Sequence, residues 1–181
     1  MTLVVLLGGA RSGKSHLAQA LALAGSAPVT VVATATAGDD EMAQKIATHR
    51  AERPAAWSTL EEPTDLATAL ARVPAADTVI VDCLTVWVAN LLDRRDTSAI
   101  VLGHAGEACA GAVARSGTTI VVSNEVGLGV VPATELGRAY RDLLGEVNRL
   151  WVARADRAWF VIAGKAIPLA GVEEIGDLAR D

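Results

Sequence analysis

A glycine-rich stretch near the start of the chain carries the clearest sign of chemistry. Residues 8–15 read GGARSGKS and follow the apolar run LVVLL. This spacing matches a phosphate-binding loop, in which glycines let backbone N–H groups face a phosphate and the next helix adds its positive end. Lys14 is expected on the β- and γ-phosphates, and the Ser15 hydroxyl on Mg²⁺. The sequence therefore predicts that a nucleoside triphosphate binds along Gly8, Gly9, Ala10, Arg11, Ser12, Gly13, Lys14 and Ser15.

A second oxygen ligand for Mg²⁺ is expected at the end of a neighbouring strand. Asp82 follows the apolar run TVIV and stands in that position. An acid there is also a common N-cap of the next helix, and spacing leaves both roles open. The guanine-reading segment Asn-Lys-x-Asp of Ras-type switches is absent from the sequence, which disfavours a GTPase switch.

A helix is predicted within residues 39–57, which read DDEMAQKIATHRAERPAAW, and candidate reactive residues lie near its end. Asp39 or Asp40 is expected to cap this helix, and Pro54 to end it or follow its end. Met42 and Ile46 form its apolar face.

His49 falls on that same apolar face, a spacing typical of a partly buried core histidine. Arg50 and Arg53 flank it, however, and a neutral imidazole beside two guanidiniums is well suited to receive a phosphate group. Imidazole can also act as a covalent nucleophile. Spacing alone leaves the structural and the chemical role open.

Alternation of short apolar runs with helical stretches predicts the elements that position these residues. Continuous apolar or β-branched runs are typical of strands covered on both faces, and five occur: Leu3–Leu7, Val29–Thr34, Thr78–Val81, Thr118–Ser123 and Ala158–Ile162. Helical spacing predicts helices over Lys14–Leu23 and Thr134–Ala155. Leu136, Tyr140, Leu143, Leu144, Val147, Leu150 and Trp151 of the second are expected in the core. The sequence thus predicts an α/β fold of the P-loop NTPase type, a mostly parallel sheet covered by helices on both faces, in a single nucleotide-binding catalytic domain, 1–181.

Composition limits the partners that the chain can have. Its 181 residues are 51% hydrophobic and carry a net charge of −5, which disfavours a broad basic surface for nucleic acid. No apolar run reaches the length of a membrane span. MTLVVLLGG lacks a basic start and a cleavage site, and two cysteines are typical of a reduced compartment. We expect a cytoplasmic protein that binds neither nucleic acid nor membrane.

Several segments together resemble one known family. GGARSGKS, DDEM, IATHRAERPAAW, DCLTVWVANLL, SNEVGLGVVP and RAYRDLLGEVN occur in this order. The set is similar to the bifunctional adenosylcobinamide kinase / adenosylcobinamide-phosphate guanylyltransferases of cobalamin biosynthesis, over residues 4–168. The segment around His49 and SNEVGLGVVP are far more specific than the phosphate-binding loop.

The resemblance implies two reactions on one substrate. Enzymes of this family phosphorylate adenosylcobinamide with ATP or GTP, then transfer GMP from GTP to that phosphate, which yields adenosylcobinamide-GDP and pyrophosphate. A histidine of the family carries GMP covalently, and the motif H-R-x-x-R-P places it on His49. Lys14 is implied as the second catalytic residue.

The resemblance also extends the nucleotide site beyond the glycine-rich loop. It implies contacts from Ala33, Thr34, Ala35, Arg50, Ala51, Glu52, Arg53, Glu61 and Asp82. Mg²⁺, held by Ser15 and Asp82, would accompany GTP or ATP as substrates, with no tightly bound organic cofactor. Family members also imply a homo-oligomer. Asn124 and Glu125 follow a predicted strand and lie in a glycine-rich segment. This segment is either a loop that binds a ligand or a plain turn with a capping Asn, and the sequence leaves both open.

Two other functions remain open at this stage. One is a P-loop kinase of another small molecule in which His49 is only structural and no covalent nucleotidylation occurs. The other is a non-catalytic nucleotide-dependent switch. Label retained on the chain after mixing with GTP labelled at the α-phosphate would favour the bifunctional enzyme over both.

Overall fold

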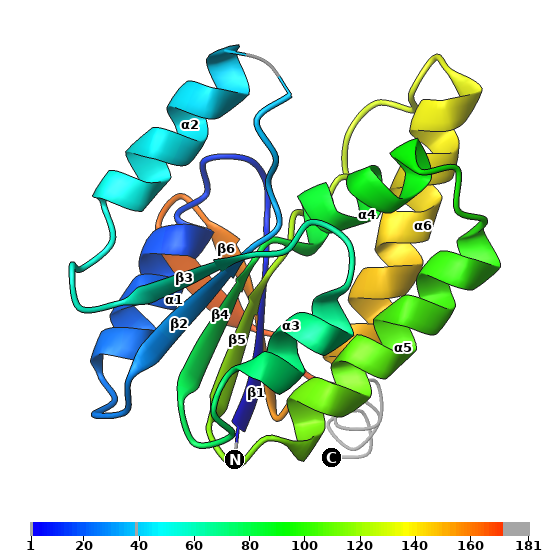
Figure 1. The fold of residues 1–181 in the computed structure, drawn as a ribbon. Coiled ribbons are helices and arrows are strands. Elements are labelled where there is room, and N and C mark those ends of the chain that lie inside the picture. The colour runs from blue at the N-terminus through cyan, green and yellow to red at the C-terminus, as the bar shows by residue number, and fades with distance from the viewer. Residues whose placement is uncertain (1, 39, 172–181) are drawn as a thin grey trace.

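One mixed sheet organises the part of the chain that the structure describes. The structure, a computed structural model, describes residues 2–38 and 40–171. Within them, seven strands form a sheet in the order β3-β2-β4-β5-β1-β6-β7 (Figure 1). Pairing is parallel throughout except between β6 and β7. The strands are β1 (Thr2–Leu7), β2 (Val29–Ala33), β3 (Ser58–Glu61), β4 (Thr78–Asp82), β5 (Thr118–Val122), β6 (Arg157–Ile162) and β7 (Lys165–Pro168).

Helices cover both faces because the central strands are apolar on both sides. Along β1, Leu3, Val5 and Leu7 join one buried cluster and Val4 and Leu6 the other, as strand alternation requires. The first cluster lies under α3 (Leu66–Arg72), α4 (Leu84–Asp93), α5 (Ser98–Ala114) and α6 (Glu135–Val152). The second lies under α1 (Lys14–Leu23), and α2 (Asp40–Ala51) stands beyond it (Figure 1). The predicted α/β sheet covered on both faces is confirmed.

The five predicted strands all occur, with ends that shift by one residue. The helix predicted over Lys14–Leu23 is found with those bounds, and that over Thr134–Ala155 spans Glu135–Val152 because Thr134 is its N-cap, accepting a hydrogen bond from the Gly137 N–H. Within it, Leu136 is 65% exposed, so its predicted core position is wrong: it lies in the first turn, beyond the sheet. Asp39 lies outside the described residues, and Asp40 is the first residue of α2.

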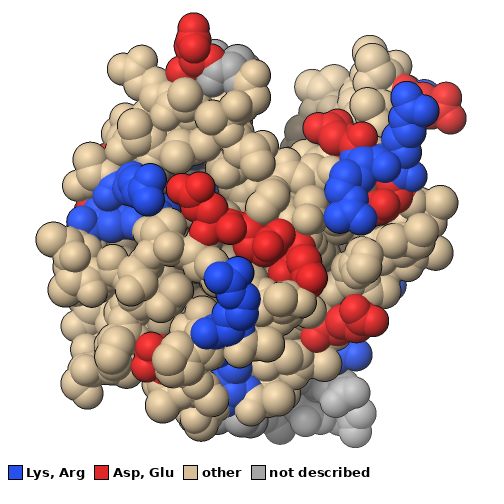
Figure 2. All heavy atoms as spheres, viewed as in Figure 1, with Lys and Arg blue, Asp and Glu red and all other residues tan. Residues whose placement is uncertain are grey.

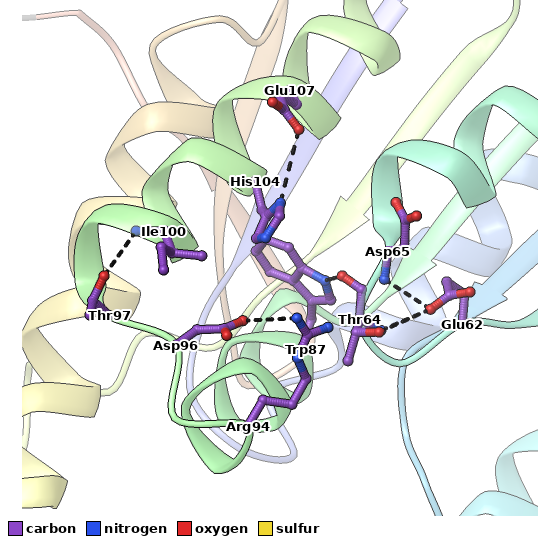
Figure 3. A network of polar contacts seen from close by, with 10 residues as sticks. All are labelled: Glu62, Thr64, Asp65, Trp87, Arg94, Asp96, Thr97, Ile100, His104 and Glu107. Carbon is purple, nitrogen blue, oxygen red and sulfur yellow. Dashed lines mark hydrogen bonds and ion pairs between the residues drawn. The ribbon is translucent and has the colours of Figure 1, made fainter.

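A network of polar contacts joins the helices on the larger buried face (Figure 3). The Trp87 indole N–H donates to the carbonyl oxygen of Thr64 at 2.8 Å, which ties α4 to the segment before α3. Asp65 caps α3 by accepting from the Thr68 N–H, and these bonds lower the pKa of its carboxyl. Thr97 caps α5 in the same way. None of the described helices is long and apolar enough to cross a membrane.

Candidate active site

The glycine-rich loop follows β1 and leads into α1, as a phosphate-binding loop requires. Gly8 has φ +151°, and a Cβ there would lie 2.2 Å from the carbonyl oxygen of Val161. Gly13 has φ +102°, and a Cβ there would lie 3.3 Å from Gly164. Both positions therefore need glycine for backbone conformation, and Gly8 also for space.

Lys14 lies buried inside this loop. Its ammonium donates to the carbonyl oxygen of Gly9 at 2.6 Å and to the hydroxyl of Ser12 at 3.3 Å. Burial lowers the pKa of Lys14, while nearby Cys83 and Asp82 act in the opposite direction. The loop thus holds a cation where its backbone N–H groups can meet a phosphate.

Strand register aligns the predicted site residues along the carboxyl edge of the sheet. Ala33 of β2 pairs with Glu61 of β3 on one side and with Asp82 of β4 on the other. The Thr34 N–H donates to the carbonyl oxygen of Asp82 at 3.0 Å. Segments far apart in the sequence, including the predicted Ala33–Ala35 stretch, therefore lie at the same edge of the sheet as the phosphate-binding loop.

Arg53 reaches into this edge from the chain that follows α2. Its guanidinium lies 3.5 Å from the carboxylate of Asp82 and donates to the hydroxyl of Thr59 at 3.2 Å. Both members of the ion pair are largely buried, with side chains 11% and 23% exposed. Arg53, Asp82 and Ser15 line one small cavity, together with Trp57.

The donors around this cavity fit Mg²⁺. Ser15 supplies a hydroxyl and Asp82 a carboxylate, and both are oxygen ligands of the kind that this hard cation takes. The N-cap role left open for Asp82 is wrong, because Cys83 is the N-cap of α4 and no side chain caps that helix. Asp82 instead pairs with Arg53.

The last turn of α2 is tied to the same edge by a second ion pair. Arg50 lies 3.5 Å from Glu61, with both side chains 62% exposed. His49 is exposed and does not line the cavity, and neither do the exposed Ala51 and Glu52. The core position that spacing allowed for His49 is therefore wrong. The side chain is open to a reaction partner, although it lies outside the cavity.

The family model for cobinamide kinase / cobinamide phosphate guanyltransferase matches residues 4–169. The chain belongs to this family. It is therefore an enzyme of the bifunctional kinase and guanylyltransferase kind.

Relatives of the cobinamide kinase family match along nearly their whole length. The bifunctional adenosylcobalamin biosynthesis protein CobP of Pseudomonas aeruginosa is 47% identical over 92% of this chain and 96% of its own. The proteins named CobU are 36% identical in Salmonella typhimurium and 35% in Escherichia coli, each over 92% of this chain and 99% of its own.

Solved structures at low identity show the fold alone. An ATPase of a bacterial type III secretion system superposes with a TM-score of 0.55 at 11% identity over 98% of this chain, which spans only 61% of the ATPase. The RadB recombinase gives a TM-score of 0.50 at 17% identity, over 88% of this chain and 73% of its own. Both support the P-loop arrangement of this cobinamide kinase family member.

Several hydrogen bonds that support the site were not predicted from the sequence. The Thr34 hydroxyl donates to the Cys83 carbonyl oxygen at 2.8 Å and accepts from the Cys83 N–H at 2.9 Å, which locks β2 to β4. The Asn90 amide donates to the carbonyl oxygens of Thr34 and Pro63. A polar residue inside the apolar helix sequence TVWVANLL is the one signal that pointed to Asn90.

The turn between β6 and β7 supports the glycine-rich loop from the other side. The Gly164 N–H donates to the carbonyl oxygen of Ser12 at 2.9 Å. Ala163 and Gly164 both have positive φ, as tight hairpin turns require. On the outer surface, a notch lies above the carboxyl edge, between the lobe of α2 and the lobe that holds the start of α6 (Figures 1 and 2).

Proposed function

We infer that this enzyme phosphorylates adenosylcobinamide with ATP or GTP and then transfers GMP from GTP to the new phosphate. The products of the second reaction are adenosylcobinamide-GDP and pyrophosphate. His49 carries GMP covalently between the two halves of that transfer. All substrates are small molecules, and the reactions belong to the cytoplasm.

The ion pair between Arg53 and Asp82 is the observation that carries this inference. Arg53 follows His49 by four residues, and its guanidinium reaches the carboxylate that borders the same cavity as Ser15 of the phosphate-binding loop. Arg50, next to His49, pairs with Glu61 on the same edge. The exposed imidazole is thus followed closely by two arginines that pair with acidic residues at the carboxyl edge.

The roles of the other residues follow from their chemistry. The Lys14 ammonium and the loop N–H groups would hold the β- and γ-phosphates, and Arg50 and Arg53 would offset charge near the α-phosphate. Ser15 and Asp82 would hold Mg²⁺, which supplies positive charge to the phosphate oxygens when bound. The remaining residues proposed to contact nucleotide are Ala33, Thr34, Ala35, Ala51, Glu52 and Glu61.

The covalent transfer balances in two displacements. A neutral ring nitrogen of His49 attacks the α-phosphorus, the bond to the bridging oxygen breaks, and pyrophosphate leaves with that electron pair. A phosphate oxygen of adenosylcobinamide phosphate then attacks the same phosphorus, and the P–N bond breaks to return its pair to the imidazole. Both displacements occur at the α-phosphorus, whereas the phosphorylation step occurs at the γ-phosphorus of the nucleotide.

Labelled GTP tests this assignment directly. We expect protein mixed with GTP labelled at the α-phosphate, then denatured, to retain label that acid releases and alkali does not. His49→Ala should lose this label because the accepting nitrogen is gone. The chain has three histidines, so His16→Ala and His104→Ala are matched controls that should retain it.

Other outcomes would change the proposal. Label retained by His49→Ala but lost in His16→Ala would move the covalent site to α1. Absence of label in the wild-type protein, together with phosphoryl transfer to another small alcohol, would support a plain P-loop kinase instead.

A further inference from the structure

The segment that leaves β5 begins between the two halves of the phosphate site. β5 lies between β1, which leads into the glycine-rich loop, and β4, which ends in Asp82. Val122, its last residue, pairs with Leu6 of β1 and with Asp82 of β4. Whatever follows Val122 therefore stands beside the end of the nucleotide where the γ-phosphate is expected.

Backbone hydrogen bonds hold this segment in place. The Glu125 N–H donates to the carbonyl oxygen of Gly8, the first residue of the glycine-rich loop, at 3.1 Å. The Asn124 N–H donates to the Thr85 hydroxyl at 2.7 Å, and its carbonyl oxygen accepts from the Asn148 amide at 3.0 Å. Asn124 and Glu125 thus occupy fixed positions, with half-buried side chains.

The Glu125 carboxylate has unused accepting capacity. One oxygen accepts from the Gly127 N–H at 2.6 Å, and no cationic side chain of the described residues pairs with Glu125. An ionised carboxylate accepts several hydrogen bonds and donates none. Such a group beside a γ-phosphate is suited to take the proton of an attacking hydroxyl.

The residues that follow Glu125 expose apolar side chains to solvent. Leu128 is 78% exposed, Val130 96% and Val131 63%. We define residues 124–131 as the acceptor loop; it leaves the carboxyl edge on the side opposite to α2 (Figure 1). Exposed apolar residues that adjoin a reaction site are typical of a surface that binds a partly apolar ligand.

We propose that the acceptor loop binds the corrin substrate for the phosphorylation step and that Glu125 is the base of that step. This proposal rests on the function proposed above, and it adds a binding site for the corrin substrate to the nucleotide site. The corrin macrocycle lies against Leu128, Val130 and Val131, and its hydroxyl approaches the γ-phosphorus beside Glu125. The hydroxyl oxygen bonds to that phosphorus, its proton passes to the carboxylate, and the bond to the β–γ bridging oxygen breaks to release ADP or GDP.

The position of the acceptor loop separates the two reactions. His49 approaches the nucleotide from the side of α2 and β3, whereas Glu125 approaches from β5. GMP transfer from His49 to an existing phosphate needs no proton acceptor, because that phosphate is already ionised. Glu125 should therefore be required for phosphorylation and not for guanylylation.

Glu125→Gln tests the proposed base. We expect kcat for phosphorylation of adenosylcobinamide to fall at least about 100-fold, the usual scale for loss of a general base. Label from α-labelled GTP on His49, and its transfer to supplied adenosylcobinamide phosphate, should stay within about twofold of wild type. Glu125→Asp should restore part of kcat. Glu146→Gln, at an exposed site on α6, is the matched control.

Two results would overturn this role. Phosphorylation at the wild-type rate in Glu125→Gln would exclude the base, and an equal loss of both reactions would make Glu125 a structural residue. If wild-type protein fails to phosphorylate adenosylcobinamide at all, the proposed function itself fails.

A pair of glycines tests the position of the carboxylate independently. A Cβ on Gly127 would lie 2.8 Å from the Glu125 Oε1, whereas a Cβ on Gly145, an exposed glycine of α6 outside the acceptor loop, would meet no atom within 4 Å. Gly127→Ala should therefore displace the carboxylate and lower kcat for phosphorylation about tenfold or more, and Gly145→Ala should not. Equal effects of the two variants would contradict the assignment.

Val130→Ser tests the apolar part of the acceptor loop. We expect the KM for adenosylcobinamide to rise about tenfold because apolar contact is lost, with the KM for GTP unchanged. Sedimentation velocity of the same variant addresses the competing occupant, a second copy of the chain. An unchanged KM with altered sedimentation would assign these side chains to a contact between copies and overturn the corrin site.

Discussion

Tyr140 is the one tyrosine of the chain, so its ionisation can be followed alone. Its hydroxyl donates to the carbonyl oxygen of Thr85 at 3.1 Å. Burial, with a smaller effect of Cys83, raises the pKa of Tyr140 to about 12. Because the ordinary value is about 10, the folded state holds this proton more tightly than the unfolded state.

We therefore expect phenolate absorbance to rise near pH 12 in native protein and near pH 10 in urea, as the pKa of Tyr140 requires. The stabilising contribution is complete below pH 10 and is lost as pH rises towards 12. Tyr140→Phe should abolish the absorbance change. A single midpoint near pH 10 in the folded protein would contradict the buried environment.

Some residues of the candidate site could be predicted from the sequence, and others could not. The glycine-rich loop can be recognised from the sequence because all its residues are contiguous. The pair of Arg53 and Asp82 brings together residues from the chain after α2 and from the end of β4, and spacing along the sequence does not reveal this contact. The contacts predicted for nucleotide at Ala33–Ala35, Arg50–Arg53 and Glu61 remain predictions, although the structure aligns them on one edge.

Among the elements, the hairpin of β6 and β7 acts as the support of the phosphate-binding loop. Gly8 faces the Val161 carbonyl oxygen so closely that a Cβ would overlap it, whereas a Cβ on Gly9 would meet no atom within 4 Å. We expect Gly8→Ala to lower the free energy of unfolding by about 1–3 kcal/mol without nucleotide. Gly9→Ala should change it by less than about 0.5 kcal/mol. Urea denaturation of both variants measures the difference, and equal stabilities would contradict this close contact.

The two strands that the sequence did not predict share a physical cause. β3 has the sequence STLE and β7 the sequence KAIP, and each is a four-residue edge strand. Edge strands are covered on fewer sides, so they lack the continuous apolar run that identified the central strands. The strands β1, β2, β4, β5 and β6 each have a neighbouring strand on both sides, and they were predictable for the opposite reason.

Over the whole molecule, a buried set of structural hydrogen bonds and the proposed reacting groups lie at opposite ends of the strands. Arg115 is buried just before β5 and donates to four backbone carbonyl oxygens, those of Leu70, Val73, Pro74 and Asp77. These bonds join the end of α5 to the connection between α3 and β4. The reacting groups stand at the carboxyl ends of the same strands.

Arg115→Met should therefore destabilise the protein without changing its chemistry. We expect a loss of about 3 kcal/mol in the free energy of unfolding, because buried carbonyl oxygens lose their donors. Activity per folded molecule should match wild type. Arg72→Met, at an exposed arginine on the same side, is the control. A loss of kcat at full folding would show that the two edges are coupled.

The pairs formed by Arg53 and Arg50 also bear on how fast a nucleotide is captured. The chain carries a net charge of −5, and a triphosphate is a polyanion that such a surface repels at long range. Asp82 and Glu61, at the carboxyl edge of the sheet, each face a guanidinium 3.5 Å away. The arginines thereby offset the fields of these two carboxylates, which lowers the electrostatic barrier that an approaching polyanion meets at this edge.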